Sequence, residues 1–171
     1  VRISFARTIL PMIYPSGMAT QVIAVANQKG GVGKTTTSIN LAACLANQGQ
    51  RVLLLDLDPQ ANATSGVGVE KREGGSAYPV LVGDALLTDQ IVRTQFPNLS
   101  VIPSEVDLCG AEIDLPRMDD HLHRLQGALD SVKMANVYDV ILIDCPPSLG
   151  SLTLNAFAAA DSILVPLQCE Y

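Results

Sequence analysis

The pattern of apolar and polar residues divides this chain into alternating strand-like and helix-like segments. Five short, continuous apolar runs predict strands that are buried on both faces, because a half-exposed strand alternates apolar with polar residues. These predicted strands cover residues 21–26, 51–56, 99–103, 140–144 and 162–166.

Helical spacing of apolar residues fills most of the intervals between these strands. It predicts helices over residues 35–48, 83–93, 119–134 and 151–160, of which the second has only a weak apolar face. Gly49 is the expected C-terminal cap of the first helix. Residues 61–80 are rich in Gly, Ser and Ala and predict a surface loop.

This alternation predicts an α/β fold with a doubly wound, mostly parallel sheet and helices on both faces. The chain has 171 residues, enough for one domain with a sizeable core, and 48% of them are hydrophobic while 16% are charged. The net charge of −6 argues against a large basic surface for nucleic acid. No run approaches the roughly 20 apolar residues of a membrane-spanning helix, so we expect no membrane association.

The first 17 residues differ from the rest of the chain. Residues 1–17 combine two arginines with a short apolar run interrupted by Pro11, which only faintly imitates a signal peptide. We predict that residues 1–17 are a disordered or non-native extension, that Met18 is the natural start, and that residues 18–171 form the folded domain. A short membrane-binding or partner-binding tail is the alternative.

The four cysteines are far apart and form no CxxC pattern or Cys/His cluster, which argues against a metal site made of thiolates. They are Cys44, Cys109, Cys145 and Cys169. Cysteines without a disulfide framework are typical of a reducing compartment. Together with the nucleotide-binding motif described next, they predict a cytoplasmic protein.

A phosphate-binding motif lies between the first predicted strand and the first predicted helix. It reads Lys29-Gly30-Gly31-Val32-Gly33-Lys34-Thr35-Thr36, and Gly33-Lys34-Thr35 supply the Gly-Lys-Ser/Thr end of the pattern Gly-x-x-x-x-Gly-Lys-Ser/Thr, while Gln28 and Lys29 stand at its first two positions in place of the usual leading glycine. Small residues allow successive backbone N–H groups to surround phosphate oxygens, and the helix adds its positive dipole end. We expect Lys34 to reach the outer phosphates and Thr35 to offer its hydroxyl to Mg²⁺.

Acidic residues follow two of the predicted strands. Asp56 and Asp144 each end a strand, and ligands of open α/β sheets bind beyond the carboxyl ends of strands. We expect Asp144 to hold a water bound to Mg²⁺; the alternative is a capping role at a turn. Asp58 lies two residues after Asp56, so the two side chains are expected to face differently and to have different roles.

Several segments, read together, resemble the ParA/Soj chromosome- and plasmid-partitioning ATPases, which are relatives of MinD. Residues 26–37 resemble the deviant Walker A box of that family, and residues 55–66 resemble its second acidic motif. The resemblance covers residues 19–171 and continues through residues 105–113, 144–150 and 165–171.

This resemblance implies a P-loop NTPase fold that uses ATP and Mg²⁺. The phosphates would lie against Gly30, Gly31, Val32, Gly33, Lys34, Thr35 and Thr36. It further implies that Lys29 acts in trans across a nucleotide-sandwich dimer and that Asp58 orients the attacking water, while Asp56 joins Thr35 and Asp144 near the metal. From the residues alone, the ammonium group of Lys29 could contact the nucleotide of its own subunit, a carboxylate, or a nucleotide on another subunit.

The resemblance also implies partners and a strand order. In the family, ATP binding drives homodimerisation, a ParB-like protein stimulates hydrolysis, and the dimer binds nucleoid DNA in the cytoplasm. Family members continue beyond the fifth strand, so we expect residues for adenine and DNA contact to be missing and DNA binding to be weak or absent. The implied order of the five predicted strands is 3-2-4-1-5, which leaves residues 162–167 at an exposed edge.

Two further positions are candidates for conformational switching. Pro146-Pro147-Ser148 is expected to form a turn that senses the γ-phosphate, or simply a stiff loop cap. Asn62 is a candidate interface or switch residue. Two other functions remain open: a MinD-like division-site ATPase, and a truncated module that binds a nucleotide or a partner without turnover.

Overall fold

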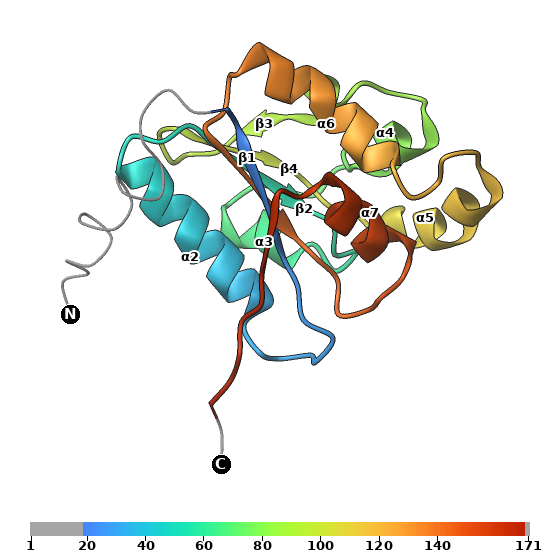
Figure 1. The fold of residues 1–171 in the computed structure, drawn as a ribbon. Helices are drawn as coiled ribbons and strands as arrows, with labels where there is room; N and C mark the ends of the chain where they lie inside the picture. Colours follow the sequence, from blue (N-terminus) through green and yellow to red (C-terminus); the bar gives the residue numbers. More distant parts are fainter. Residues whose placement is uncertain (1–18, 170–171) are drawn as a thin grey trace.

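A central, mostly parallel sheet organises the chain in the computed structural model, which describes residues 19–169 (Figure 1). The prediction for residues 1–17 lies outside the described residues. The sheet has the order β3-β4-β2-β5-β1-β6. Its strands are β1 (Gln21–Val25), β2 (Val52–Asp56), β3 (Val92–Arg93), β4 (Leu99–Ile102), β5 (Val140–Asp144) and β6 (Ser162–Leu164).

The five predicted strands are all present, in the order implied by the resemblance. All four neighbouring pairs among them are parallel, and only the two-residue strand β3 runs antiparallel to its neighbour β4. Every residue of β2 and β5 is buried, because these strands lie inside the sheet and helices cover both of its faces.

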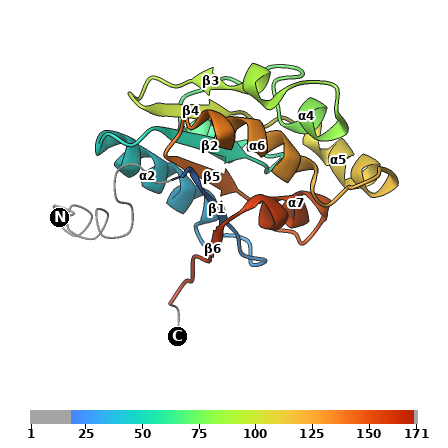
Figure 2. The same cartoon turned by 45° about the horizontal axis from the view of Figure 1, so that its top comes forward.

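Helices cover the two faces of the sheet unequally (Figure 2). The helices α2 (Lys34–Asn47) and α3 (Asn62–Gly66) pack on one face, against Val52 and Leu54 of β2. The opposite face, which includes Leu53 and Leu55, is covered by α4 (Tyr78–Val82), α5 (Leu108–Asp114), α6 (Arg124–Ala135) and α7 (Ser151–Ala159). The doubly wound α/β prediction is therefore confirmed.

Gly49 has a φ of 89° just beyond α2, and it ends that helix in the left-handed conformation, as predicted.

Other predicted boundaries were wrong where local backbone geometry interrupts the apolar pattern. The helix expected over residues 119–134 begins only at Arg124, because Asp120 adopts a φ of 58° and breaks any continuous helix there. The weak helix expected over residues 83–93 is instead a 3₁₀ turn, η1 (Leu87–Gln90), followed by β3. Gly83, with a φ of 96°, ends α4 just before this segment.

The expected loop over residues 61–80 contains the short helix α3 and the first turn of α4, which ends at Val82. Also missed were α5 and the 3₁₀ turn η2 (Leu115–Arg117) that follows it. These elements are too short to produce a repeating apolar pattern, and they form because they pack against the sheet.

Candidate phosphate-binding site

The loop between β1 and α2 is an open cradle of backbone. Gly31 and Gly33 adopt φ values of 75° and 88°, a conformation that other L-residues rarely adopt. A Cβ atom added to Gly30, Gly31 or Gly33 would meet no other heavy atom within 4 Å. The loop therefore borders free space at the N-terminus of α2, where backbone N–H groups attract anions.

Lys34 is the first residue of α2, and its side chain lies beneath this loop. It is 7% exposed, and its Nζ lies 3.5 Å from the backbone oxygen of Lys29. Among residues 19–169, no carboxylate forms an ion pair with Lys34. A nearly buried ammonium group without a carboxylate partner favours a bound anion such as phosphate.

Lys29 is exposed at the start of the same loop. Its backbone N–H donates to Asn27 Oδ1 at 2.9 Å, and Asn27 Nδ2 donates to the oxygen of Pro166 at 2.9 Å. Asn27 thus ties the loop to the segment that follows β6. Within the described part of the chain Lys29 pairs with no carboxylate, so its ammonium group is free to reach outward.

Asp144 lies beside the start of α2 with one carboxylate oxygen unused. Oδ1 accepts a hydrogen bond from Ser38 Oγ at 2.7 Å, whereas the buried Oδ2 has no hydrogen-bond partner among residues 19–169. Burial raises the pKa of Asp144, and the hydroxyl groups of Ser38 and Thr35 oppose that rise. An unsatisfied buried carboxylate oxygen near a threonine hydroxyl fits a hydrated magnesium ion.

Asp56 is fully buried beside Asp144, but protein donors occupy both of its oxygens. Oδ2 accepts from Thr64 Oγ1 at 2.7 Å and from Thr64 N at 2.8 Å, while Oδ1 accepts from Asp58 N at 3.2 Å. Burial raises the pKa of Asp56 to about 7, although the bonds from Thr64 lower it. Asp144 therefore offers a carboxylate oxygen that Asp56 does not, and the metal roles of both residues stay predictions.

Asp58 lies in a loop that is fastened to the end of β4. Ser104 Oγ donates to the backbone oxygen of Asp58 at 2.6 Å, and Ser104 N donates to Thr64 Oγ1 at 2.9 Å. Asp58 Oδ1 accepts from Gln60 N at 3.0 Å, which tightens the turn. Sequence reasoning missed Thr64 and Ser104. The only signal for Ser104 was a hydroxyl residue directly after a predicted strand.

The candidate switch residues, Pro146-Pro147-Ser148 and Asn62, are exposed except for Pro146, which is buried. Pro147 and Ser148 are exposed in the post-β5 loop, which we define as residues 145–150. Thr153 Oγ1 donates to the oxygen of Ser148 at 2.7 Å and links this loop to α7. Asn62 is exposed at the start of α3. Both switch roles remain predictions.

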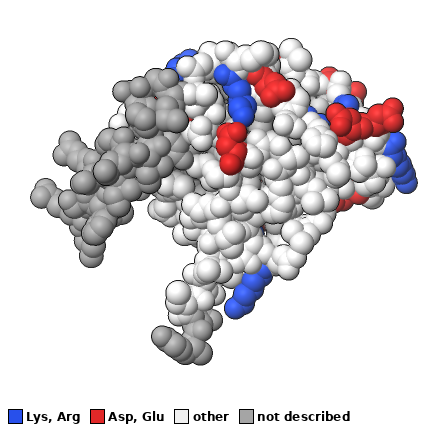
Figure 3. All heavy atoms as spheres, in the orientation of Figure 1, with Lys and Arg blue, Asp and Glu red and all other residues white. Residues whose placement is uncertain are grey.

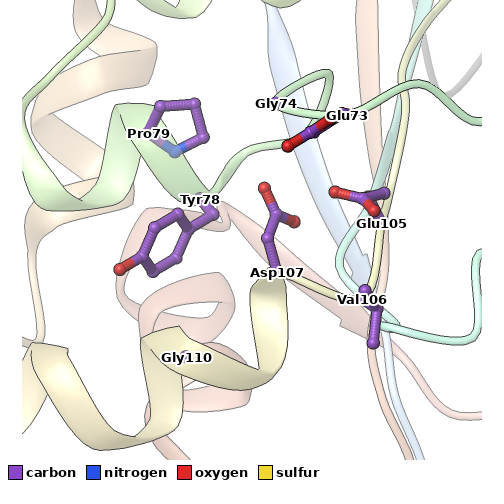
Figure 4. Close-up of a pocket in the computed structure, with 8 residues that line it drawn as sticks. All are labelled: Glu73, Gly74, Tyr78, Pro79, Glu105, Val106, Asp107 and Gly110. Carbon is purple, nitrogen blue, oxygen red and sulfur yellow. The ribbon is translucent and has the colours of Figure 1, made fainter.

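A cavity of about 800 Å³ opens at a different place, between α4 and α5 (Figure 4). Figure 4 shows the carboxylates of Glu73, Glu105 and Asp107 around it. None of the predicted site residues lines this cavity. Its acidic lining would repel phosphate, so the β1–α2 loop remains the predicted phosphate site.

Comparisons with known proteins show the family to which the chain belongs. Residues 20–171 match the family model described as AAA domain. Over 152 residues the chain is 56% identical to the sporulation initiation inhibitor protein Soj of Bacillus subtilis, covering 88% of this chain and 59% of Soj. It is 50% identical to the chromosome partitioning protein ParA of Caulobacter vibrioides, covering 88% of this chain and 57% of that protein.

The fold also matches a solved structure, that of cobyrinic acid a,c-diamide synthase from Mycobacterium smegmatis with bound ATP analog and magnesium. The TM-score is 0.84 with 46% sequence identity, and the match covers 89% of this chain and 62% of that one. The chain spans somewhat less than three fifths of the length of Soj and ParA, 59% and 57% respectively. Within residues 19–169, no helix is both long enough and apolar enough to cross a membrane.

Proposed function

Since this chain belongs to the AAA domain family and is similar to Soj and ParA over 88% of its length, we propose that it is a partitioning ATPase that binds ATP and Mg²⁺ at residues 29–36. One observation carries this proposal. Among residues 19–169, Lys34 at the start of α2 is a nearly buried cation without a carboxylate partner, and Asp144 at the end of β5, bonded to Ser38 of α2, has a buried oxygen without a donor. Phosphate and hydrated magnesium would satisfy both.

The proposed reaction is hydrolysis of the γ-phosphate of ATP. Phosphoryl transfer depends mainly on positioning and on stabilising charge, so it needs few protein groups. The backbone of residues 30–36 and the ammonium group of Lys34 hold the phosphate oxygens, and the carboxylate of Asp58 orients the attacking water. Thr35 and Asp144 would hold Mg²⁺, which neutralises negative charge on the phosphates when it is bound.

A second copy of the chain completes the proposed cycle. The exposed ammonium group of Lys29 would reach the nucleotide of that copy and stabilise an ATP-bound sandwich dimer. This dimer would act in chromosome or plasmid segregation in the cytoplasm and would be stimulated by a ParB-like protein. An exposed lysine that pairs with no carboxylate among residues 19–169 supports this role over an internal ion pair.

We do not expect residues 1–171 to bind DNA strongly. Figure 3 shows basic and acidic side chains scattered over one face, with a broad uncharged area between them. Non-specific DNA affinity depends on several Lys and Arg contacts with phosphates. The net charge of −6 also opposes such binding, so we expect weak binding or none.

The proposal is tested by measuring the rate of Mg²⁺-dependent ATP hydrolysis by the whole chain and by a Lys34→Ala variant. We expect turnover by the wild type and a loss of at least about a hundredfold in the variant, because Lys34 stabilises the transferred phosphoryl group. If both proteins are folded and equally inactive, the enzyme proposal fails.

A separate ATP-binding measurement then distinguishes the alternatives. Binding without turnover would indicate a nucleotide-binding module, whereas ATP-dependent vesicle binding would favour a MinD-like function.

A further inference from the structure

The N-terminus of α7 is capped by a side chain from another helix. Ser151 N donates to Glu112 Oε2 at 2.7 Å, and Leu152 N donates to Glu112 Oε1 at 3.3 Å. Gly150, which precedes α7, supplies no side-chain cap of its own. The carboxylate of Glu112 therefore satisfies two of the free N–H groups of α7 and faces the positive end of its dipole.

Because Gly150 has no side chain, the carboxylate of Glu112 can occupy the space beside its Cα atom. A Cβ atom added at Gly150 would collide with the carboxylate of Glu112. The backbone of Gly150, with a φ of −85° and a ψ of −170°, is one that any residue adopts, so glycine is not needed there for its conformation. The absence of a side chain at this position serves the contact with Glu112.

This cap lies at one end of the post-β5 loop. The other end of that loop follows Asp144, which Ser38 holds against α2. Between the two ends, Pro147, Ser148 and Leu149 are exposed. We propose that Glu112 is a positioning residue that fixes the far end of the post-β5 loop and so holds the loop in place beside the nucleotide. Its effect on turnover rests on the proposed function, whereas its effect on the loop does not.

Apolar packing holds α5 and α7 together independently of this cap. The two helices lie side by side in both ribbon views (Figure 1, Figure 2), and Leu108, Ala111 and Leu152 belong to the same buried cluster. Removal of the Glu112 carboxylate should therefore leave the helices packed. The removal should instead make the first turn of α7 and the post-β5 loop more mobile.

Hydrogen exchange tests the cap without any need for turnover. In a Glu112→Ala variant we expect the amides of Ser151 and Leu152 to exchange about two- to thirtyfold faster, the range that corresponds to loss of a helix cap. The amides of Ser148 and Leu149 should also exchange faster. Glu70→Ala, at an exposed glutamate between α3 and α4, is the matched control and should change none of these rates. Unchanged exchange in Glu112→Ala would overturn the proposal.

A double-mutant cycle tests whether Gly150 and Glu112 act together. Gly150→Ala should displace the carboxylate and speed exchange at Ser151 and Leu152 as much as Glu112→Ala does. In the Glu112→Ala background, Gly150→Ala should have no further effect, because the carboxylate is already absent. Additive effects would contradict the proposed contact. Glu112→Gln keeps one acceptor oxygen and should restore part of the protection.

Steady-state kinetics separates positioning from a purely structural role. We expect Glu112→Ala to lower kcat for ATP hydrolysis by roughly tenfold while KM changes by less than about twofold. An unchanged kcat together with a lower thermal unfolding midpoint would mean that the cap is structural only. If the wild type binds ATP without hydrolysing it, the function proposed above fails, while the exchange measurements still decide the role of Glu112 in the loop.

Discussion

Asp56 and Asp144 lie opposite each other at the carboxyl ends of the paired strands β2 and β5. Their surroundings nevertheless differ, because Thr64 and the Asp58 backbone occupy the oxygens of Asp56, whereas Asp144 Oδ2 is buried without a donor from the described residues 19–169. Burial raises the pKa of both carboxyl groups. Two aspartates that look equivalent in the sequence thus have different surroundings: protein donors hold both oxygens of Asp56, and we predict that the remaining oxygen of Asp144 faces a cation.

Asp144→Asn should weaken the Mg²⁺ dependence of ATP binding. The substitution removes the negative charge that we expect to hold a magnesium-bound water, and changes of this kind reduce metal affinity by about ten- to a hundredfold. Isothermal titration of ATP at several Mg²⁺ concentrations measures the effect. Ser38→Ala, which removes the hydrogen bonds of Ser38 Oγ to Asp144 Oδ1 and to the backbone oxygen of Lys34 but keeps the negative charge of Asp144, is the control and should have a smaller effect. Equal Mg²⁺ dependence in Asp144→Asn and the wild type would contradict the assignment.

Thr64→Val should destabilise the domain and lower ATP hydrolysis. Valine keeps the shape but removes the hydroxyl that donates to Asp56 and accepts from Ser104 N. Leaving such buried groups unpaired costs about 1–3 kcal/mol. Urea unfolding measures the loss, and Thr64→Ser, which keeps the hydroxyl, should recover most of it. The network would be unimportant if valine and serine gave the same unfolding midpoint and the same turnover as threonine.

Lys29→Ala should keep ATP binding but lose ATP-dependent dimerisation. The side chain is exposed and makes no ion pair within residues 19–169, so its removal should not disturb the fold. Light scattering with and without Mg²⁺ and a slowly hydrolysed ATP analog measures the change in mass. Lys133→Ala, which removes a lysine that pairs with Asp161, is the matched control. Unchanged dimerisation in Lys29→Ala would exclude the role in trans.

Acid should abolish the contribution of the ion pair between Arg51 and Asp139. Arg51 donates through Nε and Nη2 to the carboxylate of Asp139, and this contact lowers the pKa of Asp139. A lowered pKa means that the stabilisation is present above the unfolded pKa, near 4, and disappears as the pH falls through the folded value. Arg51→Gln should therefore lower the unfolding midpoint at pH 7 and have little effect near pH 2. An equal loss at both pH values would show that the pair contributes through packing alone.

Much of this fold was predictable because its signals are local. The strands β2 and β5 are continuous apolar runs that end in aspartate, and the phosphate loop is a contiguous motif between a strand and a helix. The short helices α3 and α5 were missed because one or two turns produce no apolar period. The false start of α6 at residue 119 came from apolar spacing that continues past the left-handed residue Asp120.

The sequence by itself determined the order of elements, the phosphate loop and the family, because each depends on residues that are close together along the chain. Only the tertiary structure decided which carboxylate keeps a free oxygen, which hydroxyls fasten the Asp58 loop, and which residue caps α7. Those contacts join residues separated by 39 positions for Glu112 and Ser151 and by 106 for Ser38 and Asp144. Such pairs meet because α2, α5 and α7 pack against the sheet, and no local pattern along the chain predicts these contacts.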